Sequence, residues 1–169
     1  EMDEVKNDRL ILITRYAVML AITVVMTMII HIPILGTKGY LNLGDMVVFL
    51  AAVMFGKKGG FVVGGLGSAL ADILLGYSYY APITFVVKGL EGFFCAALLE
   101  TKTGKKLPFL PMIIGGIWMA LGYYIAEIFM YGAKAALISM PANLIQGVVG
   151  AVLAIALKTA LKKTRIFNL

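Results

Sequence analysis

Three charged residues, Asp72, Lys88 and Glu91, lie inside apolar runs of the sequence. An unpaired charge in a membrane-spanning helix costs at least ~2.5 kcal/mol, so such residues usually pair, face a water-filled cavity or contact a ligand. Thr84, Lys88 and Glu91 are spaced so that they share one face of a helix. These side chains suit hydrogen bonding and charge neutralisation, and together they indicate a binding site.

The composition indicates that the solvent around these runs is a lipid bilayer. Of 169 residues, 61% are hydrophobic and 14% are charged, whereas soluble domains are closer to half apolar and carry about a quarter charged residues. We therefore expect a single membrane domain over residues 1–169, with a polar head at 1–8, in a cell membrane. No nucleotide-binding loop, nucleophile–base set or metal-binding set is visible, which argues against an enzyme, a metal site or a bound cofactor.

The apolar runs predict an all-α membrane protein, a bundle of six transmembrane helices. A span takes about 20 helical residues, and five of the six runs are that long or nearly so. The run at 44–56 is short and must tilt or be sheltered by its neighbours. The six runs cover residues 10–31, 44–56, 59–76, 81–100, 108–131 and 135–157.

The basic residues predict the orientation, because cytoplasmic loops are enriched in Lys and Arg. With both termini cytoplasmic, twelve basic residues fall on or near the inner side, and only Lys38 and Lys134 fall outside. The net charge of +6 is therefore explained by topology and lipid contact rather than by nucleic-acid binding. The twelve are Lys6, Arg9, Arg15, Lys57, Lys58, Lys102, Lys105, Lys106, Lys158, Lys162, Lys163 and Arg165.

In this orientation, the costly polar groups of the last four helices lie in the outer half of the membrane or near its middle. Their convergence at one depth favours a cavity that is open to the outside and binds a ligand or an ion. The candidate binding residues are Asp72, Tyr79, Thr84, Lys88, Glu91, Tyr123, Glu127, Asn143 and Gln146.

Structural roles are the alternative for several of these residues. Lys88 could form a buried ion pair with Asp72 or with Glu91 that only holds helices together. Asp45, at the start of the second helix, could merely cap it. Tyrosines between residues 77 and 80 lie where an interfacial aromatic belt would place them.

Small residues at four-residue spacing predict close helix packing, as in Gly60 with Gly64 and Gly92 with Ala96. The first helix carries Ala17 and Ala21 at this spacing and has no buried charge beyond Arg15, near its cytoplasmic end. This helix need not line the cavity, so it is free to offer a smooth face to a partner protein.

The longest external connection, residues 31–45, is a candidate lid over the cavity. Its proline and glycines favour turns over helix. His31 either contacts the ligand or lies at the membrane interface.

The sequence LGDMVVFLAAVMFGKKGGFVVGGLGSALADILLGYSYYAPITFVVKGLEG, residues 43–92, resembles the S component of energy-coupling factor (ECF) vitamin transporters. It is similar to the branch associated with riboflavin, hydroxymethylpyrimidine or vitamin B6 uptake. Ala17-x-x-x-Ala21 matches the AxxxA motif by which this family contacts its transmembrane coupling subunit. The resemblance implies capture of a vitamin from outside, and delivery by toppling when the chain engages the coupling subunit and two ATPases. It makes loop 31–45 the gate, with Pro33, Gly36, Gly39 and Asn42.

A ligand such as pyridoxine or hydroxymethylpyrimidine suits the polar residues best, with riboflavin second. Glu127, Asn143 and Gln146 would bond hydroxyl groups and ring nitrogens, and Tyr123 or Tyr79 would stack on the ring. The alternative is a self-sufficient proton-coupled transporter or channel in which Asp72, Lys88 and Glu91 relay protons.

Overall fold

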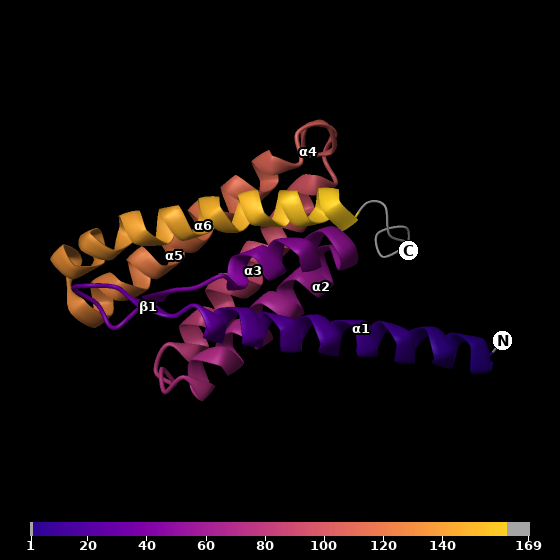
Figure 1. Ribbon diagram of the computed structural model, residues 1–169, viewed down its shortest axis with the longest axis horizontal. Coiled ribbons are helices and arrows are strands. Elements are labelled where there is room, and N and C mark those ends of the chain that lie inside the picture. The colour runs from indigo at the N-terminus through magenta and orange to yellow at the C-terminus, as the bar shows by residue number, and fades with distance from the viewer. Residues whose placement is uncertain (1, 162–169) are drawn as a thin grey trace.

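The computed structural model describes residues 2–161, with side chains from residue 7 onward (Figure 1). Expectations for Glu1, Lys162, Lys163 and Arg165, and for the Lys6 side chain, lie outside the described part of the chain. The elements are α1 (Met2–Ile29), β1 (Ile32–Pro33), β2 (Tyr40–Leu41), α2 (Gly44–Leu74), α3 (Ala81–Leu99), α4 (Lys102–Lys106), α5 (Phe109–Tyr131) and α6 (Ala133–Leu161).

Helix α2 doubles back on itself at Gly56, where φ is 67° and ψ is −160°. This backbone conformation is readily adopted only by glycine. A Cβ built on Gly64 would lie 2.9 Å from Val48 Cγ1, although sixteen residues of straight helix would separate these positions by about 24 Å. Residues 44–55 and 57–74 therefore form a tight helical hairpin, close to the two runs, 44–56 and 59–76, that the sequence predicts.

In the part of the chain that the structure describes, five helices are long and apolar enough to cross a membrane, and α2 is counted among them as one. The expected runs at 81–100, 108–131 and 135–157 agree with α3, α5 and α6 within a few residues. The polar residues at the start of the chain continue into α1, which is helical from Met2 and has no glycine or proline before Ile29 to interrupt it. The connection between α3 and α5 contains the short helix α4.

Glycines allow the helices to touch backbone to backbone. A Cβ on Gly60 in α2 would lie 2.6 Å from the Gly92 carbonyl oxygen in α3. A Cβ on Gly116 in α5 would lie 2.8 Å from Gly147 Cα in α6. Both distances are too short for any side chain, so the predicted small-residue contacts fix the α2–α3 and α5–α6 pairs.

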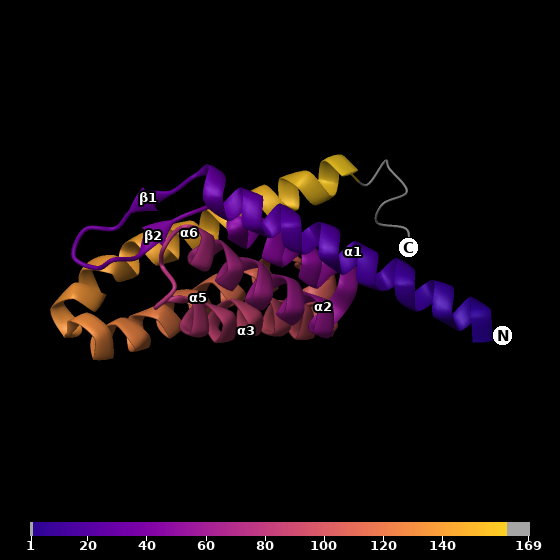
Figure 2. The ribbon, with the colours of Figure 1, turned by 90° about the horizontal axis from the view of Figure 1, so that it is seen from below.

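The antiparallel strands β1 and β2 and the turn at 75–80 lie at one end of the bundle, here called the loop end (Figure 1). The described start of α1 and end of α6 lie at the opposite end. Figure 2 shows that the first turns of α1 project past the other helices. The connection predicted to be a lid thus has its own hydrogen-bonded hairpin, in which Ile34 N donates to the Gly39 carbonyl oxygen over 2.9 Å.

The backbone contact between Gly60 and Gly92 predicts a large effect of Gly60→Val. The valine must push α3 away from α2, and overpacking of this kind typically costs about 1–3 kcal/mol. We expect a thermal midpoint in detergent several degrees below that of the parent protein. Ala156→Val, on an exposed position of α6, is the control and should leave the midpoint unchanged. Equal midpoints for Gly60→Val and the parent protein would contradict the close α2–α3 packing.

Candidate functional site

A polar cavity lies at the loop end, between the β1–β2 connection and the helices. It is small: the centre of a water-sized molecule can reach about 30 Å³ of it. The lining residues come from every long helix and from the loop: Thr27, Gly39, Tyr40, Asn42, Ser68, Asp72, Tyr80, Thr84, Lys88, Tyr123, Glu127, Asn143 and Gln146.

Seven of the nine candidate binding residues line this cavity: Asp72, Thr84, Lys88, Tyr123, Glu127, Asn143 and Gln146. Glu91 is fully buried next to Lys88 and is not one of the lining residues. Tyr79 is 45% exposed outside the cavity, and the neighbouring Tyr80 lines it instead. Tyr79 and Tyr80 both lie in the turn at 75–80 that leads into α3, so a shift of one residue decides which ring faces inward.

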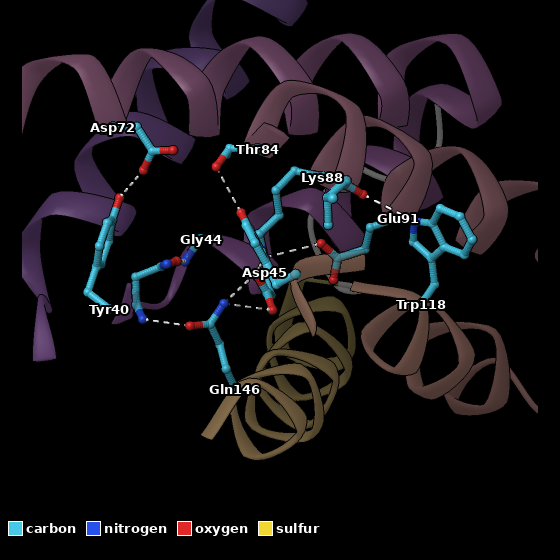
Figure 3. Close-up of polar contacts among 12 residues, drawn as sticks. Tyr40, Gly44, Asp45, Asp72, Thr84, Lys88, Glu91, Trp118 and Gln146 are labelled. Carbon is cyan, nitrogen blue, oxygen red and sulfur yellow. Dashed lines mark hydrogen bonds and ion pairs between the residues drawn. The ribbon is translucent and has the colours of Figure 1, made fainter. Parts of the chain in front are cut away.

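Lys88 is buried between two carboxylates (Figure 3). Its Nζ donates to Asp45 Oδ1 and lies 3.2 Å from Glu91 Oε2. Gln146 Nε2 lies 3.2 Å from both Asp45 oxygens. Lys88 is only 2% exposed, and both carboxylates are fully buried. This cluster, Asp45–Lys88–Glu91, joins the start of α2 to α3 and, through Gln146, to α6.

The cluster decides between the structural alternatives raised by the sequence. Asp45 does not cap α2, because the cap position is Leu43, where no side chain bonds the backbone; Asp45 instead accepts hydrogen bonds from α3 and α6. The ion pair of Lys88 with Glu91 is present, and no Asp72–Lys88 pair occurs among the described residues. Asp72 bonds the loop instead.

Hydrogen bonds tie the loop to α2 and α6 and shape its end (Figure 3). Tyr40 Oη donates to Asp72 Oδ1 over 2.6 Å, and Asn42 N donates to Gln146 Oε1 over 2.9 Å. Gly44 N donates to Asn42 Oδ1 over 2.8 Å, which shapes the entry into α2. The chain between β2 and α2 therefore forms one wall of the cavity.

Glu127 on α5 is a second buried carboxylate of the cavity, and both of its oxygens are occupied. Tyr80 Oη donates to Oε1 over 2.9 Å, and Ser139 Oγ donates to Oε2. A Cβ on Gly39 would lie 3.3 Å from Glu127 Oε1, so the loop reaches this carboxylate without a side chain. Tyr123 Oη, also on α5, bonds Thr84 Oγ1 over 3.0 Å.

The tyrosines at the mouth of the cavity stay protonated at neutral pH. Burial, and after it the charge of Asp72, raises the pKa of Tyr40 far above its usual value. Burial and then Glu127 do the same to the pKa of Tyr80. Each phenol is therefore a hydrogen-bond donor to its carboxylate.

Several cavity atoms have no hydrogen-bond partner. They are Thr27 Oγ1, Ser68 Oγ and Asp72 Oδ2, on residues that are 2%, 3% and 4% exposed. Thr27 belongs to α1, so the first helix does line the cavity, although the sequence did not require it to. Thr27 carries no charge and lies in an apolar run, so the sequence does not identify it as a cavity residue.

Sequence reasoning also missed Tyr40, Ser68 and Tyr80. Ser68 could have been found, because it precedes Asp72 by one helical turn on the same face of α2. The inward turn of Tyr40 depends on the register of β1 and β2, in which Pro33 pairs with Tyr40. That pairing links residues across the loop and has no local signature.

The remaining predicted residues lie away from the cavity. Ala17 and Ala21 are exposed on α1. Pro33 is exposed in β1, and Gly36 turns the hairpin with a φ of 92° beside Ile138. His31 Nε2 lies 3.0 Å from Tyr77 Oη, at the loop end. Among the described side chains, residues 7–161, no cluster of three or more His, Cys, Asp or Glu is suited to a metal ion.

Comparison with known proteins places this architecture among membrane transporters. Residues 9–163 match the family described as ECF-type riboflavin transporter, S component. A thiamine precursor transporter, HmpT, of Lactococcus lactis is 31% identical over 163 residues, which cover 96% of this chain and 94% of the relative. An uncharacterised protein of Pyrococcus woesei is 39% identical over 143 residues, 85% of this chain and 95% of that protein.

The buried cluster predicts that Lys88→Met destabilises the protein strongly. Removing one partner of a buried ion pair typically costs about 3–5 kcal/mol, because the remaining charge is uncompensated. Lys57→Met, which breaks the exposed pair with Glu100 at 2.8 Å, is the matched control and should cost at most about 1 kcal/mol. Asp45→Asn should restore part of the stability of Lys88→Met. Thermal unfolding in detergent measures all four proteins, and equal losses for the two lysine variants would contradict the cluster.

Proposed function

Because the chain belongs to the family of ECF-type riboflavin transporter S components, we propose that it captures one small water-soluble vitamin or vitamin precursor in the cavity under the β1–β2 loop. The protein is a multi-pass protein of the plasma membrane that takes part in vitamin or precursor uptake, and it is not an enzyme. The observation that carries the proposal is the polar cavity itself, closed on one side by a loop that hydrogen-bonds to helices α2 and α6.

The ligand we propose first is a hydroxymethyl-substituted heteroaromatic ring of the pyrimidine or vitamin B6 type, with riboflavin second. The lining offers amide, hydroxyl and carboxylate groups on several sides of a small space, which suits a single ring with polar substituents better than a three-ring system. The relative HmpT is named for a thiamine precursor. Asn143 has no hydrogen-bond partner among the described residues, which leaves its amide to bond a ligand.

We further propose six membrane crossings with both termini in the cytoplasm. The two arms of α2 run in opposite directions, which supplies the sixth crossing, although its first arm, residues 44–55, is short. Lys57 and Lys58 follow directly after the turn at Gly56, and α4 carries three further lysines at the end opposite the loop. These positions fit a cytoplasmic side opposite the loop end.

Delivery would depend on a transmembrane coupling subunit and two ATPases, as the family implies. Ala17 and Ala21 are exposed on α1, where a partner helix could approach closely. On the same helix, Val18, Met19 and Ile22 line an apolar groove that continues over α2 and α6. The docking face we propose is this surface of α1.

Ligand binding is tested by calorimetric titration of the purified protein with hydroxymethylpyrimidine, pyridoxine, thiamine and riboflavin. We expect one of the first two to bind without any ATPase present. Asn143→Ala should weaken that binding by roughly five- to a hundredfold, because a hydrogen bond in a buried site is lost. Asn7→Ala, an exposed amide on α1, is the matched control. The absence of binding by all four ligands would contradict the proposal, and unchanged affinity in Asn143→Ala would remove α6 from the site.

Docking is tested by Ala21→Trp and Ala17→Trp in cells that contain the coupling subunit and the ATPases. A tryptophan should block close approach of a partner helix, so uptake should fall at least tenfold while ligand binding stays intact. Ile125→Trp, at a position of α5 that is 57% exposed, is the control. Uptake that survives both alanine substitutions would exclude this face. Uptake by the chain alone, driven by a proton gradient, would support the self-sufficient transporter instead.

A further inference from the structure

We propose that Asp72 joins ligand recognition to closure of the loop. One carboxylate oxygen holds Tyr40 of the loop, and the other accepts a hydrogen bond from an N–H group of the bound ring. The cavity thereby selects heteroaromatic rings that carry an amino group. This inference rests on the proposed function, because it concerns the ligand of the same cavity.

The free oxygen of Asp72 distinguishes it from the other carboxylate that lines the cavity. Both oxygens of Glu127 are bonded, one by Tyr80 and one by Ser139. Asp72 Oδ1 accepts from Tyr40, whereas Oδ2 is buried without a partner. A buried polar atom left unsatisfied destabilises the protein, because it loses its hydrogen bonds to water and gains none. A ligand that supplies a donor at Oδ2 recovers this free energy, so the site favours an N–H donor there.

Two more unpaired oxygens, Ser68 Oγ and Thr27 Oγ1, accompany Asp72. Ser68 and Asp72 are one turn apart on the same face of α2. Thr27 lines the cavity from α1 and packs against Gly44, where a Cβ would collide with its hydroxyl. A hydroxyl both donates and accepts, whereas an ionised carboxylate only accepts. Asp72 and the two hydroxyl groups together match the edge of a ring that carries an amino group beside a ring nitrogen. The amino group donates to Asp72, and one of the hydroxyl groups donates to the ring nitrogen.

The contact with Tyr40 carries the effect to the loop. The Tyr40 ring is packed between His31 and Tyr77, with ring centroids 4.5 and 4.9 Å away, so the tyrosine cannot move without the loop. A donor at Oδ2 fixes the orientation of the carboxylate and keeps Oδ1 directed at Tyr40. Ligand and closed loop therefore stabilise each other, and this coupling is reciprocal.

The ligand preference is tested with two probes. The first is hydroxymethylpyrimidine with its ring amino group, and the second is the analogue in which hydrogen replaces that amino group. The parent protein should bind the amino compound at least tenfold more tightly. In Asp72→Asn, whose side chain has nearly the same shape, most of this preference should disappear. Equal affinities of the parent protein for both probes would overturn the inference without any variant. So would a full preference retained in folded Asp72→Asn.

These outcomes are distinct from failure of the proposed function. In that case the parent protein binds neither probe, nor pyridoxine, thiamine or riboflavin. Ser68→Ala is a second variant, since it removes an unpaired hydroxyl and should not impair folding. It should weaken binding of the amino compound severalfold, and unchanged binding would remove Ser68 from the recognition surface.

The link to the loop is tested by the dissociation rate of the amino compound, measured in stopped flow. Tyr40→Phe removes only the hydroxyl that bonds Asp72 and should raise the rate about tenfold, with a smaller effect on the analogue without the amino group. Tyr124→Phe is the matched control, because the Tyr124 hydroxyl lies outside the cavity lining. Equal rates for Tyr40→Phe and the parent protein would contradict the coupling.

Discussion

The burial of Lys88 between Asp45 and Glu91 is the constraint on which the rest of the structure depends. An ammonium group in the interior of a membrane bundle must be compensated, so the start of α2 is held against α3 at the depth of Lys88. Gln146 extends the contact from Asp45 to α6. Because α2 begins this deep in the bundle, the preceding residues must descend from the loop end and pass over the cavity.

The loop is consequently part of the binding site as well as its cover. Asn42 is bonded to α6 through its backbone, and Tyr40 to α2 through its side chain. Gly39 lies against Glu127, where a side chain would intrude. Removal of these contacts would open the cavity toward the loop end, so the same hydrogen bonds that define the site also limit access to it. This arrangement suits a protein that captures a ligand on one side of the membrane.

The sequence predicted the features that follow from local patterns. Apolar runs gave the helices, the break between the runs at 44–56 and 59–76 gave the turn in α2, and the depth of the polar residues brought Thr84, Lys88, Glu127 and Gln146 to one region. It failed where contacts link distant segments. From the sequence, a role as helix cap was an alternative for Asp45, because its partner Lys88 lies far away in the chain on α3. Thr27 could not be recognised as a cavity residue, because a threonine in an apolar run resembles its neighbours. Whether Tyr79 or Tyr80 faces the cavity depends on a shift of one residue in the turn before α3, which the sequence does not resolve.

Native mass spectrometry of the protein released from detergent tests the central claim most directly, because a ligand captured in a closed cavity should survive purification from cells. The account predicts one small molecule bound per chain, with the mass of a pyrimidine or vitamin B6 compound, displaced by adding the same compound in labelled form. The account would be contradicted by a protein that carries no small molecule and binds none of hydroxymethylpyrimidine, pyridoxine, thiamine and riboflavin when they are added.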